Sequence, residues 1–352
     1  MSSVEVVASG RVVKKNVGGN SRYVRELYPR LLDYGVNVEV AGDGIEGKSH
    51  RSARYALMES LVWPLFPPNN AQVLHFPADT GALLKASTPI VATVHGLATL
   101  HQRGVRKPLP DRVWRQRVSS NIRAATRVVT VSQSSADDII RATNAAADKI
   151  EVIHHGIDHE RFNPQSVRPS PVARLGLKET YFLYVGNIDP RKNIPAICAA
   201  AGRIFEDTGI ETVVAGAPAW DSSELMSLLS RSPGVRYLGR VPEEDLVTLM
   251  GHALAFCFPS FYEGFGFPVL EAMAVGVPVI CSDRGSLREV ASGAALVMEE
   301  PSGSELERNM RTVIQSEGLR DELRAAGLIR AKEFQWAKSA ALHADVFVGV
   351  AR

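Results

Sequence analysis

Cysteines and nucleic-acid-binding motifs are scarce in this chain, and each scarcity excludes a class of protein. Only three cysteines occur, Cys198, Cys257 and Cys281, far apart and in apolar surroundings. We therefore expect buried thiols and neither disulfides nor metal ligands. Aromatic residues make up 7% of the chain. Because no aromatic-interleaved binding motif accompanies the basic residues, nucleic acid is not an expected partner.

Long apolar runs and cofactor motifs are also missing. No stretch of about eighteen uninterrupted apolar residues occurs, and the chain begins with a strand-like segment, VEVVAS. We expect neither a transmembrane helix nor a signal peptide, and hence a cytoplasmic protein. There is no His/Cys cluster, no H-E-x-x-H, no D-x-D pair after a strand and no G-x-G-x-x-G. We therefore expect no metal site and no cofactor, and a dinucleotide-dependent oxidoreductase is disfavoured.

The length and composition fit a globular protein whose charge is distributed unevenly between its two halves. A length of 352 residues with 45% hydrophobic content is enough for two domains. Residues 1–165 hold 21 Lys and Arg against 15 Asp and Glu, whereas the remainder holds 19 against 23. A basic patch of the first half fits an anionic acceptor or an anionic membrane surface, and a solvated helix face explains it equally well. The patch comprises Arg103, Arg106, Lys107, Arg112, Arg115 and Arg117.

Short apolar runs alternate with helical patterns along the whole chain, which predicts two α/β domains with parallel sheets. Six strands are predicted in each half. In the first half they are residues 4–8, 36–41, 72–76, 90–95, 128–132 and 150–154. In the second half they are residues 182–186, 212–216, 235–239, 254–258, 277–282 and 294–297.

A Pro- and Ser-rich stretch at residues 161–171 marks the expected linker between the domains. We predict domains at residues 1–165 and 166–335, followed by a terminal helix within residues 336–352 that crosses back to the first domain. Ligands bind at the carboxyl ends of parallel strands. If those edges of the two sheets face each other, the active site is the cleft between the domains.

Two loops of the first half could bind a ligand. In NVGGN, residues 16–20, Gly18 and Gly19 can bring backbone N–H groups close to an anion at the start of a helix, although a plain turn also explains them. His95 ends a predicted strand, where a ligand would bind, but a lone histidine is more often structural. Gly156 and Asp158 in IHHGID, residues 153–158, suggest a tight turn that could reach the cleft, although turn formation alone explains them.

Two loops of the second half carry the stronger signals. In YVGNIDPRKN, residues 184–193, Arg191 and Lys192 lie where a strand opens into a helix, which suits a diphosphate. In FPSFYEGFGFPVLEAMAVGVPVICSD, residues 258–283, Glu263 precedes a glycine-rich helix start and Glu271 lies inside the helix. A buried carboxylate without a partner is costly, so both glutamates are expected to bind ligand hydroxyls.

Taken together, these motifs resemble the retaining glycosyltransferases of family 4, which have the two-domain GT-B fold. The resemblance covers nearly the whole chain in the right order. It rests on the Gly18-Gly19 loop, VH at 94–95, VS at 131–132, GID at 156–158, Gly186 with RKN at 191–193, GFGFP between the two glutamates, GVPV at 276–279 and a helix with Trp336. One departure is His155, where the family commonly has asparagine.

The resemblance implies a role for each matching residue. Arg191 and Lys192 would hold the donor diphosphate with Gly19 closing on it, Glu263 would bind the sugar, Glu271 would bind the ribose, and His95 would lie beside the sugar. The other implied donor contacts are Gly18, Gly186, Arg240 and Val241 near the base, and the backbone of Gly264, Phe265, Gly266 and Phe267.

The resemblance also implies the reaction, a transfer with retention from a nucleotide sugar to a cell-surface polysaccharide, lipopolysaccharide or glycolipid. The sequence of residues 184–193 is most similar to that of bacterial mannosyltransferases that use GDP-mannose. UDP-sugars are the alternative donors. We expect a glycan or lipid-linked acceptor and possible peripheral contact with the inner face of the membrane. The alternatives are a nucleotide-sugar epimerase or hydrolase of the same fold and a non-catalytic sugar-nucleotide-binding partner subunit.

Overall fold

The chain folds into two compact units. The structure is a computed structural model that describes residues 3–12, 18–41, 51–101, 108–169, 175–219 and 222–352. Unit 1 is Met1–Gly156 with Phe334–Arg352, and unit 2 is Ile157–Glu333. The division follows Gly156 because the segment after it packs with unit 2, where Arg161 Nη1 donates to Glu243 Oε2 at 2.8 Å.

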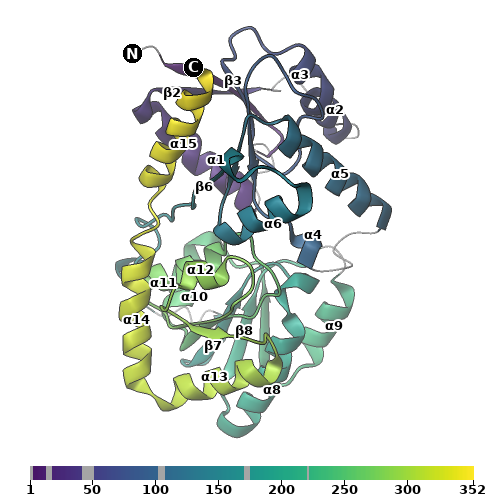
Figure 1. Ribbon diagram of the computed structural model, residues 1–352. Coiled ribbons are helices and arrows are strands. Elements are labelled where there is room, and N and C mark those ends of the chain that lie inside the picture. The colour runs from purple at the N-terminus through teal and green to yellow at the C-terminus, as the bar shows by residue number, and fades with distance from the viewer. Residues whose placement is uncertain (1–2, 13–17, 42–50, 102–107, 170–174, 220–221) are drawn as a thin grey trace. The chain divides into compact units, whose positions relative to one another are not determined.

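Unit 1 contains a six-stranded parallel sheet in the order β2-β1-β3-β4-β5-β6. Its strands are β1 (Val4–Ser9), β2 (Val36–Ala41), β3 (Val73–Phe76), β4 (Ile90–Val94), β5 (Arg127–Thr130) and β6 (Ile150–Val152). Its helices are α1 (Gly19–Leu31), η2 (Leu32–Tyr34), α2 (Arg51–Leu57), η3 (Met58–Val62), α3 (Trp63–Leu65), α4 (Ala98–His101), α5 (Pro108–Ala124), α6 (Gln133–Thr143), η4 (Ala147–Lys149) and α15 (Trp336–Ala351). Figure 1 shows them in chain colours.

Unit 2 contains a second six-stranded parallel sheet in the order β12-β11-β10-β7-β8-β9. Its strands are β7 (Tyr181–Val185), β8 (Glu211–Ala215), β9 (Val235–Gly239), β10 (Ala255–Phe258), β11 (Val279–Ser282) and β12 (Leu296–Met298). Its helices are η5 (Pro164–Ser166), η6 (Pro190–Lys192), α8 (Ile194–Thr208), α9 (Ser223–Arg231), α10 (Glu243–Gly251), α11 (Phe267–Val275), α12 (Leu287–Ala291), α13 (Gly303–Gln315) and α14 (Glu317–Ala331).

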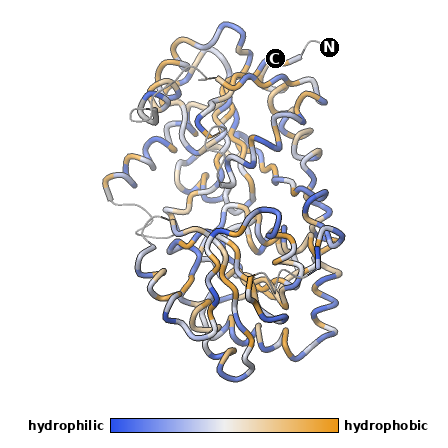
Figure 2. Tube along the Cα trace, turned by 180° about the vertical axis from the view of Figure 1, so that it is seen from behind, coloured by the Kyte–Doolittle hydropathy of each residue, from blue (hydrophilic) through white to orange (hydrophobic). Residues whose placement is uncertain are grey.

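The predicted α/β class with two parallel sheets is confirmed, and each predicted strand has a counterpart in the structure. A parallel sheet is covered by helices on both faces, so its central strands are apolar throughout and not alternating. Strand β4 is buried at every position, as is β10. Along most helices, hydrophobic and hydrophilic residues instead follow one another (Figure 2), whereas α11 is apolar over nearly its whole length. In the part of the chain that the structure describes, every helix is too short or too polar to cross a membrane.

The terminal helix α15 packs on α1 of unit 1, and buried hydrogen bonds fix it there. His343 of α15 is 1% exposed, and its Nε2 lies 2.9 Å from the Tyr23 hydroxyl of α1. The same hydroxyl lies 3.0 Å from Thr93 Oγ1 of β4. Thr93 Oγ1 in turn lies 2.9 Å from His75 Nε2 of β3, whose Nδ1 is 3.0 Å from the Tyr28 hydroxyl. We call these five residues the buried relay.

The acceptors at the end of the buried relay fix the direction of its hydrogen bonds. The carbonyl of Ser339 can only accept, so His343 Nδ1–H, at 2.7 Å, donates to it. Nε2 of the neutral ring must then accept from Tyr23, whose oxygen accepts from Thr93. Each hydrogen-bonding group of the buried relay has a partner only while both histidines are neutral. Burial lowers the pKa of His343 to about 4 and that of His75 well below its ordinary value, which keeps both rings neutral at pH 7.

Candidate functional site

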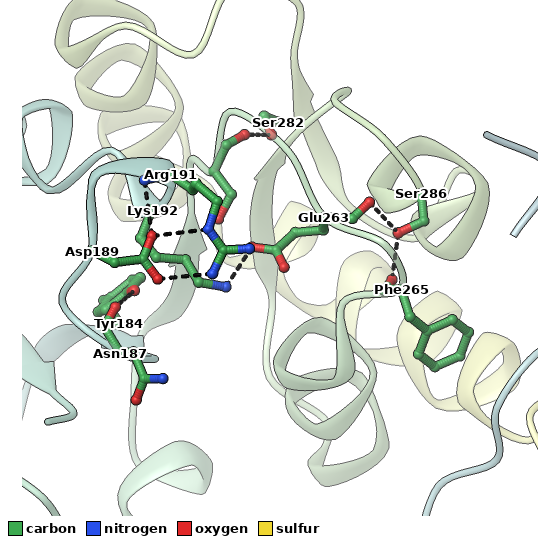
Figure 3. A network of polar contacts seen from close by, with 10 residues as sticks. Tyr184, Asn187, Asp189, Arg191, Lys192, Glu263, Phe265, Ser282 and Ser286 are labelled. Carbon is green, nitrogen blue, oxygen red and sulfur yellow. Dashed lines mark hydrogen bonds and ion pairs between the residues drawn. The ribbon is translucent and has the colours of Figure 1, made fainter. Parts of the chain in front are cut away.

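The loop after β7 holds a buried acid and two cations. Asp189 is 1% exposed and caps η6, because its carboxylate accepts from the Arg191 backbone N–H at 2.9 Å. The same carboxylate accepts from the Arg191 side chain through Nε at 3.2 Å and Nη2 at 3.0 Å (Figure 3). Such a bidentate charged pair fixes a guanidinium firmly. Arg191 is therefore held in place by its neighbour two residues earlier.

Lys192 pairs with Glu263, which comes from the loop after β10. Lys192 Nζ lies 2.6 Å from Glu263 Oε1, and the two side chains are only 12% and 11% exposed. The ammonium also lies 4.9 Å from the centre of the Phe258 ring, a favourable cation–π arrangement. The two predicted loops thus meet at the carboxyl ends of the neighbouring strands β7 and β10. We call Asp189, Arg191, Lys192 and Glu263 the four-charge cluster.

The backbone around Glu263 is held by the loop after β11. The Glu263 carbonyl accepts from the Ser286 N–H at 3.0 Å and from its hydroxyl at 3.2 Å, and that hydroxyl also lies 2.7 Å from the Phe265 carbonyl (Figure 3). At Gly285, φ is +61° and a Cβ would lie 2.3 Å from the Glu263 carbonyl oxygen. Any side chain at residue 285 would therefore displace Glu263.

Helix α11 presents its N-terminus next to this loop. Its N-cap is Gly266, with φ +97°, so no side chain caps the helix. Phe265 and Phe267 flank that position, with their rings 5.1 Å apart, and Phe265 is 5% exposed. Glu271 lies in the second turn and is 3% exposed. The helix N-terminus favours an anion in its vicinity, as the sequence suggested for Gly264 to Phe267.

The remaining residues predicted for donor binding lie at other strand ends. Gly186 directly follows β7, and its N–H donates to the Ala215 carbonyl at 3.0 Å. Arg240 is exposed, Val241 is half-buried, and both follow the edge strand β9, which β8 separates from β7. In unit 1, Gly18 is the N-cap of α1 and Gly19 is its first residue. The roles assigned to these residues stay predictions.

His95 follows β4 in unit 1, where burial favours the neutral form of its ring. Its backbone N–H donates to Asp79 Oδ1 at 2.9 Å, and Nε2 lies 3.1 Å from the Pro77 carbonyl. Burial lowers the pKa of His95, although the Asp79 carboxylate acts in the opposite direction. Because Nε2–H donates to Pro77, Nδ1 is the acceptor atom of the ring. His95 can therefore accept a hydrogen bond from a hydroxyl but is not poised to supply a proton.

His155, which replaces the usual asparagine, is part of an aromatic cluster in unit 1. It is 2% exposed, and its ring centre lies 5.6 Å from that of Trp336, 5.1 Å from that of Tyr23 and 5.5 Å from that of His95. Burial holds its pKa well below the ordinary value. The larger ring thus fills space between the turn and α15.

Unit 1 also contains a cavity of about 690 Å³ at the carboxyl ends of β1 and β3. Helix α5 forms one wall, with Trp114 as an aromatic surface and Arg117 as a cation. The opposite wall includes Arg11, whose Nη2 donates to Thr80 at 2.8 Å. The full lining is Arg11, Val12, Asn20, Ala78, Asp79, Thr80, Leu109, Pro110, Val113, Trp114 and Arg117. The volume and the mixture of aromatic and polar groups suit a sugar.

The basic patch predicted from the sequence lies only partly within the described residues. Arg103, Arg106 and Lys107 lie outside the described residues. On α5, Arg115 Nε pairs with Asp111 Oδ2 at 2.7 Å, whereas Arg117 Nη2 donates to Ser60 Oγ at 3.3 Å and lines the cavity. A step of two residues turns a helix by about 200°, so these two side chains point in opposite directions. Arg112 is exposed.

Sequence reasoning missed Asp189, Asp79, Arg11, Trp114 and the buried relay. For Asp189 there was a signal, because aspartate directly before proline is a common helix start. For the relay there was none, since Tyr23 and His343 are joined only by the fold.

Removing the Asp189 carboxylate should destabilise unit 2. We expect Asp189→Ala to lower the free energy of unfolding by about 1–3 kcal/mol, because the N-cap and the partner of a largely buried arginine are both lost. Urea denaturation followed by circular dichroism measures this. The control is Asp207→Ala, which removes an exposed ion-pair partner of Arg311 and should have a much smaller effect. Equal losses in the two variants would contradict the buried role of Asp189.

Models of known protein families match the sequence of both units. The model of the Glycosyltransferase Family 4 matches residues 17–161, and the model described as Glycosyl transferases group 1 matches residues 170–329. O-antigen chain mannosyltransferase B of Escherichia coli is 34% identical over 232 residues. That alignment covers 64% of this chain and 61% of the relative, so the chain spans less than two thirds of its length.

Solved structures share the fold at low identity. Sucrose-phosphate synthase from Thermosynechococcus elongatus has a TM-score of 0.79 at 18% identity, with 98% of both chains covered. The Anabaena protein HepE in complex with UDP and glucose has a TM-score of 0.75 at 16% identity and covers 98% of this chain and 100% of its own. Since the two family models together account for most of the sequence and the fold agrees over nearly its whole length, the chain belongs to the group 1, family 4 glycosyltransferases of the GT-B fold.

Proposed function

We propose that this protein is a retaining glycosyltransferase that moves a sugar from a nucleoside-diphosphate sugar to a hydroxyl of a glycan or lipid-linked acceptor. The observation that carries the proposal is the Lys192–Glu263 pair. The pair supports the proposal because an ammonium suits a diphosphate, a carboxylate suits sugar hydroxyls, and both lie at the carboxyl ends of two adjacent strands. Our choice of donor is GDP-mannose, supported by the mannosyltransferase relative at 34% identity.

Lys192 can serve the leaving group without releasing Glu263. An ammonium has three N–H donors, so Nζ can keep its 2.6 Å contact with Glu263 and still donate to a phosphate oxygen. Arg191, held by Asp189, adds a second positive charge next to it. These groups stabilise the diphosphate more strongly as its negative charge grows. We assign this neutralisation to Lys192, Arg191 and the α11 N-terminus, and the reaction then needs no metal.

The bond changes follow from this arrangement. The bond between the sugar C1 and the phosphate oxygen breaks, and its electron pair stays with the nucleoside diphosphate. The acceptor hydroxyl oxygen forms the new bond to C1 on the same face of the sugar. Its proton passes to the departing phosphate oxygen. Glu263 and Glu271 bind hydroxyls of the sugar and the ribose in this scheme and do not attack C1.

We assign the acceptor to the unit 1 cavity. Trp114 offers a face for a sugar ring, and Arg11, Arg117, Asp79 and Asn20 offer donors and acceptors for hydroxyl or anionic groups. His95 is joined to this cavity through Asp79, because the His95 N–H donates to its carboxylate. This position suits a neutral ring that accepts from a substrate hydroxyl.

A panel of nucleotide sugars tests the proposal on the full chain. Nucleoside diphosphate release is measured with GDP-mannose, UDP-glucose and related donors, with and without a glycan acceptor and a chelator, and the product anomer is determined by NMR. We expect the fastest release with GDP-mannose, unchanged by the chelator, and an α-linked product. No release with any donor would refute a transferase. Release without acceptor that yields an epimer or free sugar would instead favour the epimerase or hydrolase, and preference for UDP-sugars would overturn only the donor choice.

A further inference from the structure

Exposed apolar side chains gather on one side of unit 1. Residues 51–65 form one continuous helical segment, α2, η3 and α3. Along it Leu57, Leu61 and Leu65 are 55%, 36% and 56% exposed at a spacing of four residues, and Phe66 directly after it is 74% exposed. A spacing of four residues keeps side chains on one face of a helix. The opposite face is buried through Tyr55, Glu59 and Trp63.

Ser60 joins this face to its neighbours. Its carbonyl accepts from the Leu83 N–H at 3.0 Å, so the loop with the exposed Leu83 and Leu84 lies beside the helical segment. Its hydroxyl accepts from Arg117 at 3.3 Å, so α5 also lies next to the helical segment. Helices α2, α3 and α5 accordingly lie on the same side of unit 1 in both views (Figures 1 and 2). We call Leu57, Leu61, Leu65, Phe66, Leu83 and Leu84, with the exposed cations Arg54 and Lys85, the apolar–basic surface.

The charges of this surface have one sign. Within residues 54–70 and 81–90 the acid is Glu59, and it is 1% exposed, turned inward to Arg11 at 3.2 Å. Lys85 also lies near further cations, since the pKa of Lys149 is lowered by burial and by the neighbouring Lys85 and Arg127. Apolar side chains with basic residues and no exposed acid are the composition of segments that bind anionic lipid surfaces.

The unit 1 cavity adjoins this surface. Leu109 and Val113 of α5 line the cavity and are also 73% and 53% exposed. Arg117 lines it as well and donates to Ser60, a buried residue of the helical segment that carries the surface. A molecule anchored in a bilayer that contacts the apolar–basic surface would therefore reach the cavity along an apolar wall.

We propose that the apolar–basic surface docks on an anionic lipid bilayer and that the acceptor is a lipid-linked glycan, which enters the cavity from that bilayer. The second part rests on the proposed function, and the first does not. A second copy of the chain fits the surface less well than lipid does. A two-fold symmetric contact would place the same patch on both sides, so cations would face cations.

Vesicle binding by the full chain tests the docking. Sedimentation is compared for vesicles of phosphatidylcholine alone and of phosphatidylcholine with phosphatidylglycerol. We expect binding to the anionic vesicles that weakens with salt. Leu65→Ser with Phe66→Ser should reduce the partition coefficient at least about tenfold. Lys85→Gln and Arg54→Gln should each reduce it about fivefold. The control is Ile329→Ser, which changes a side chain of unit 2 that is 67% exposed and should leave binding unchanged.

Several outcomes would overturn the docking. Equal binding to neutral and anionic vesicles would contradict the docking. So would a loss of vesicle binding in Ile329→Ser equal to that in the double variant. So would a dimer in light scattering that the Leu65 and Phe66 substitutions dissociate, because the surface would then be covered by a second copy. If the double variant unfolds, as circular dichroism would show, Phe66→Ser alone replaces it, since Phe66 lies outside the helix.

Kinetics separate this proposal from the proposed function. The double variant should transfer sugar to a soluble acceptor within about twofold of wild type and lose transfer to the vesicle-borne acceptor. Equal activity on both acceptors would overturn the lipid-linked assignment. Vesicle binding without any transfer by wild type would overturn the proposed function while leaving the docking intact.

Discussion

Replacing Lys192 by alanine is expected to lower kcat about 10²–10³-fold, the cost of losing one preorganised donor at a developing negative charge. The Lys192 side chain is 12% exposed, and its Nζ is already oriented by Glu263 and the Phe258 ring, so little reorganisation is needed when the diphosphate departs. Steady-state transfer from the preferred donor measures the effect. KM should change less than kcat, because the growing charge of the leaving group is stabilised mainly in the transition state.

Two variants make this prediction specific. Lys178→Ala removes an exposed lysine of unit 2 that donates to the Gly209 carbonyl at 3.0 Å, and it should keep wild-type kinetics. Lys192→Arg should recover part of the rate, since the charge is kept while the geometry changes. If Lys192→Ala retained a kcat within about threefold of wild type, the leaving-group role of Lys192 would be wrong.

Acid should destabilise unit 1 through the buried relay. The folded pKa of His343 is about 4, below the ordinary value near 6.5, so between these pH values the unfolded chain binds more protons than the folded chain. Stability is then full above pH ~6.5 and falls as the pH is lowered toward 4, by about 3 kcal/mol for this group. His75 and His155, whose pKa values are also lowered by burial, add to the loss.

Urea denaturation between pH 4 and pH 7.5 measures this dependence. His343→Gln keeps an acceptor for the Tyr23 hydroxyl but cannot take up a proton in this range, so the slope of stability against pH should be shallower. His252→Gln, in unit 2, is the control and should leave the slope of unit 1 unchanged. A wild-type stability that is flat from pH 6.5 to pH 4.5 would contradict neutral, buried histidines.

The fold was predictable because its strands are local apolar runs. Segments such as residues 90–95 and 254–258 read as strands from a few neighbouring residues, and parallel sheets follow from the alternation with helices. The structure agrees with these predictions to within a few residues. The sequence also predicts that the loops after β7 and β10 bind a ligand, because strand, glycine loop and helix follow one another, and the structure places these loops at the ends of neighbouring strands.

The pairing of side chains was not predictable, because it depends on which strand ends become neighbours. Lys192 and Glu263 are 71 residues apart, and Tyr23 and His343 are 320 apart. The sequence suggested that Arg191 and Lys192 act alike, whereas the structure gives them different partners, Asp189 and Glu263. Within the predicted basic patch, Arg115 and Arg117 are close in sequence but point in opposite directions once α5 forms.

The decisive experiment is a crystal structure of the full chain with GDP bound. We expect the diphosphate within about 3 Å of Lys192 Nζ, the Arg191–Asp189 contacts unchanged and the ribose hydroxyls on the Glu271 carboxylate. A nucleotide bound away from the four-charge cluster, with the Lys192–Glu263 pair untouched, would contradict this expectation.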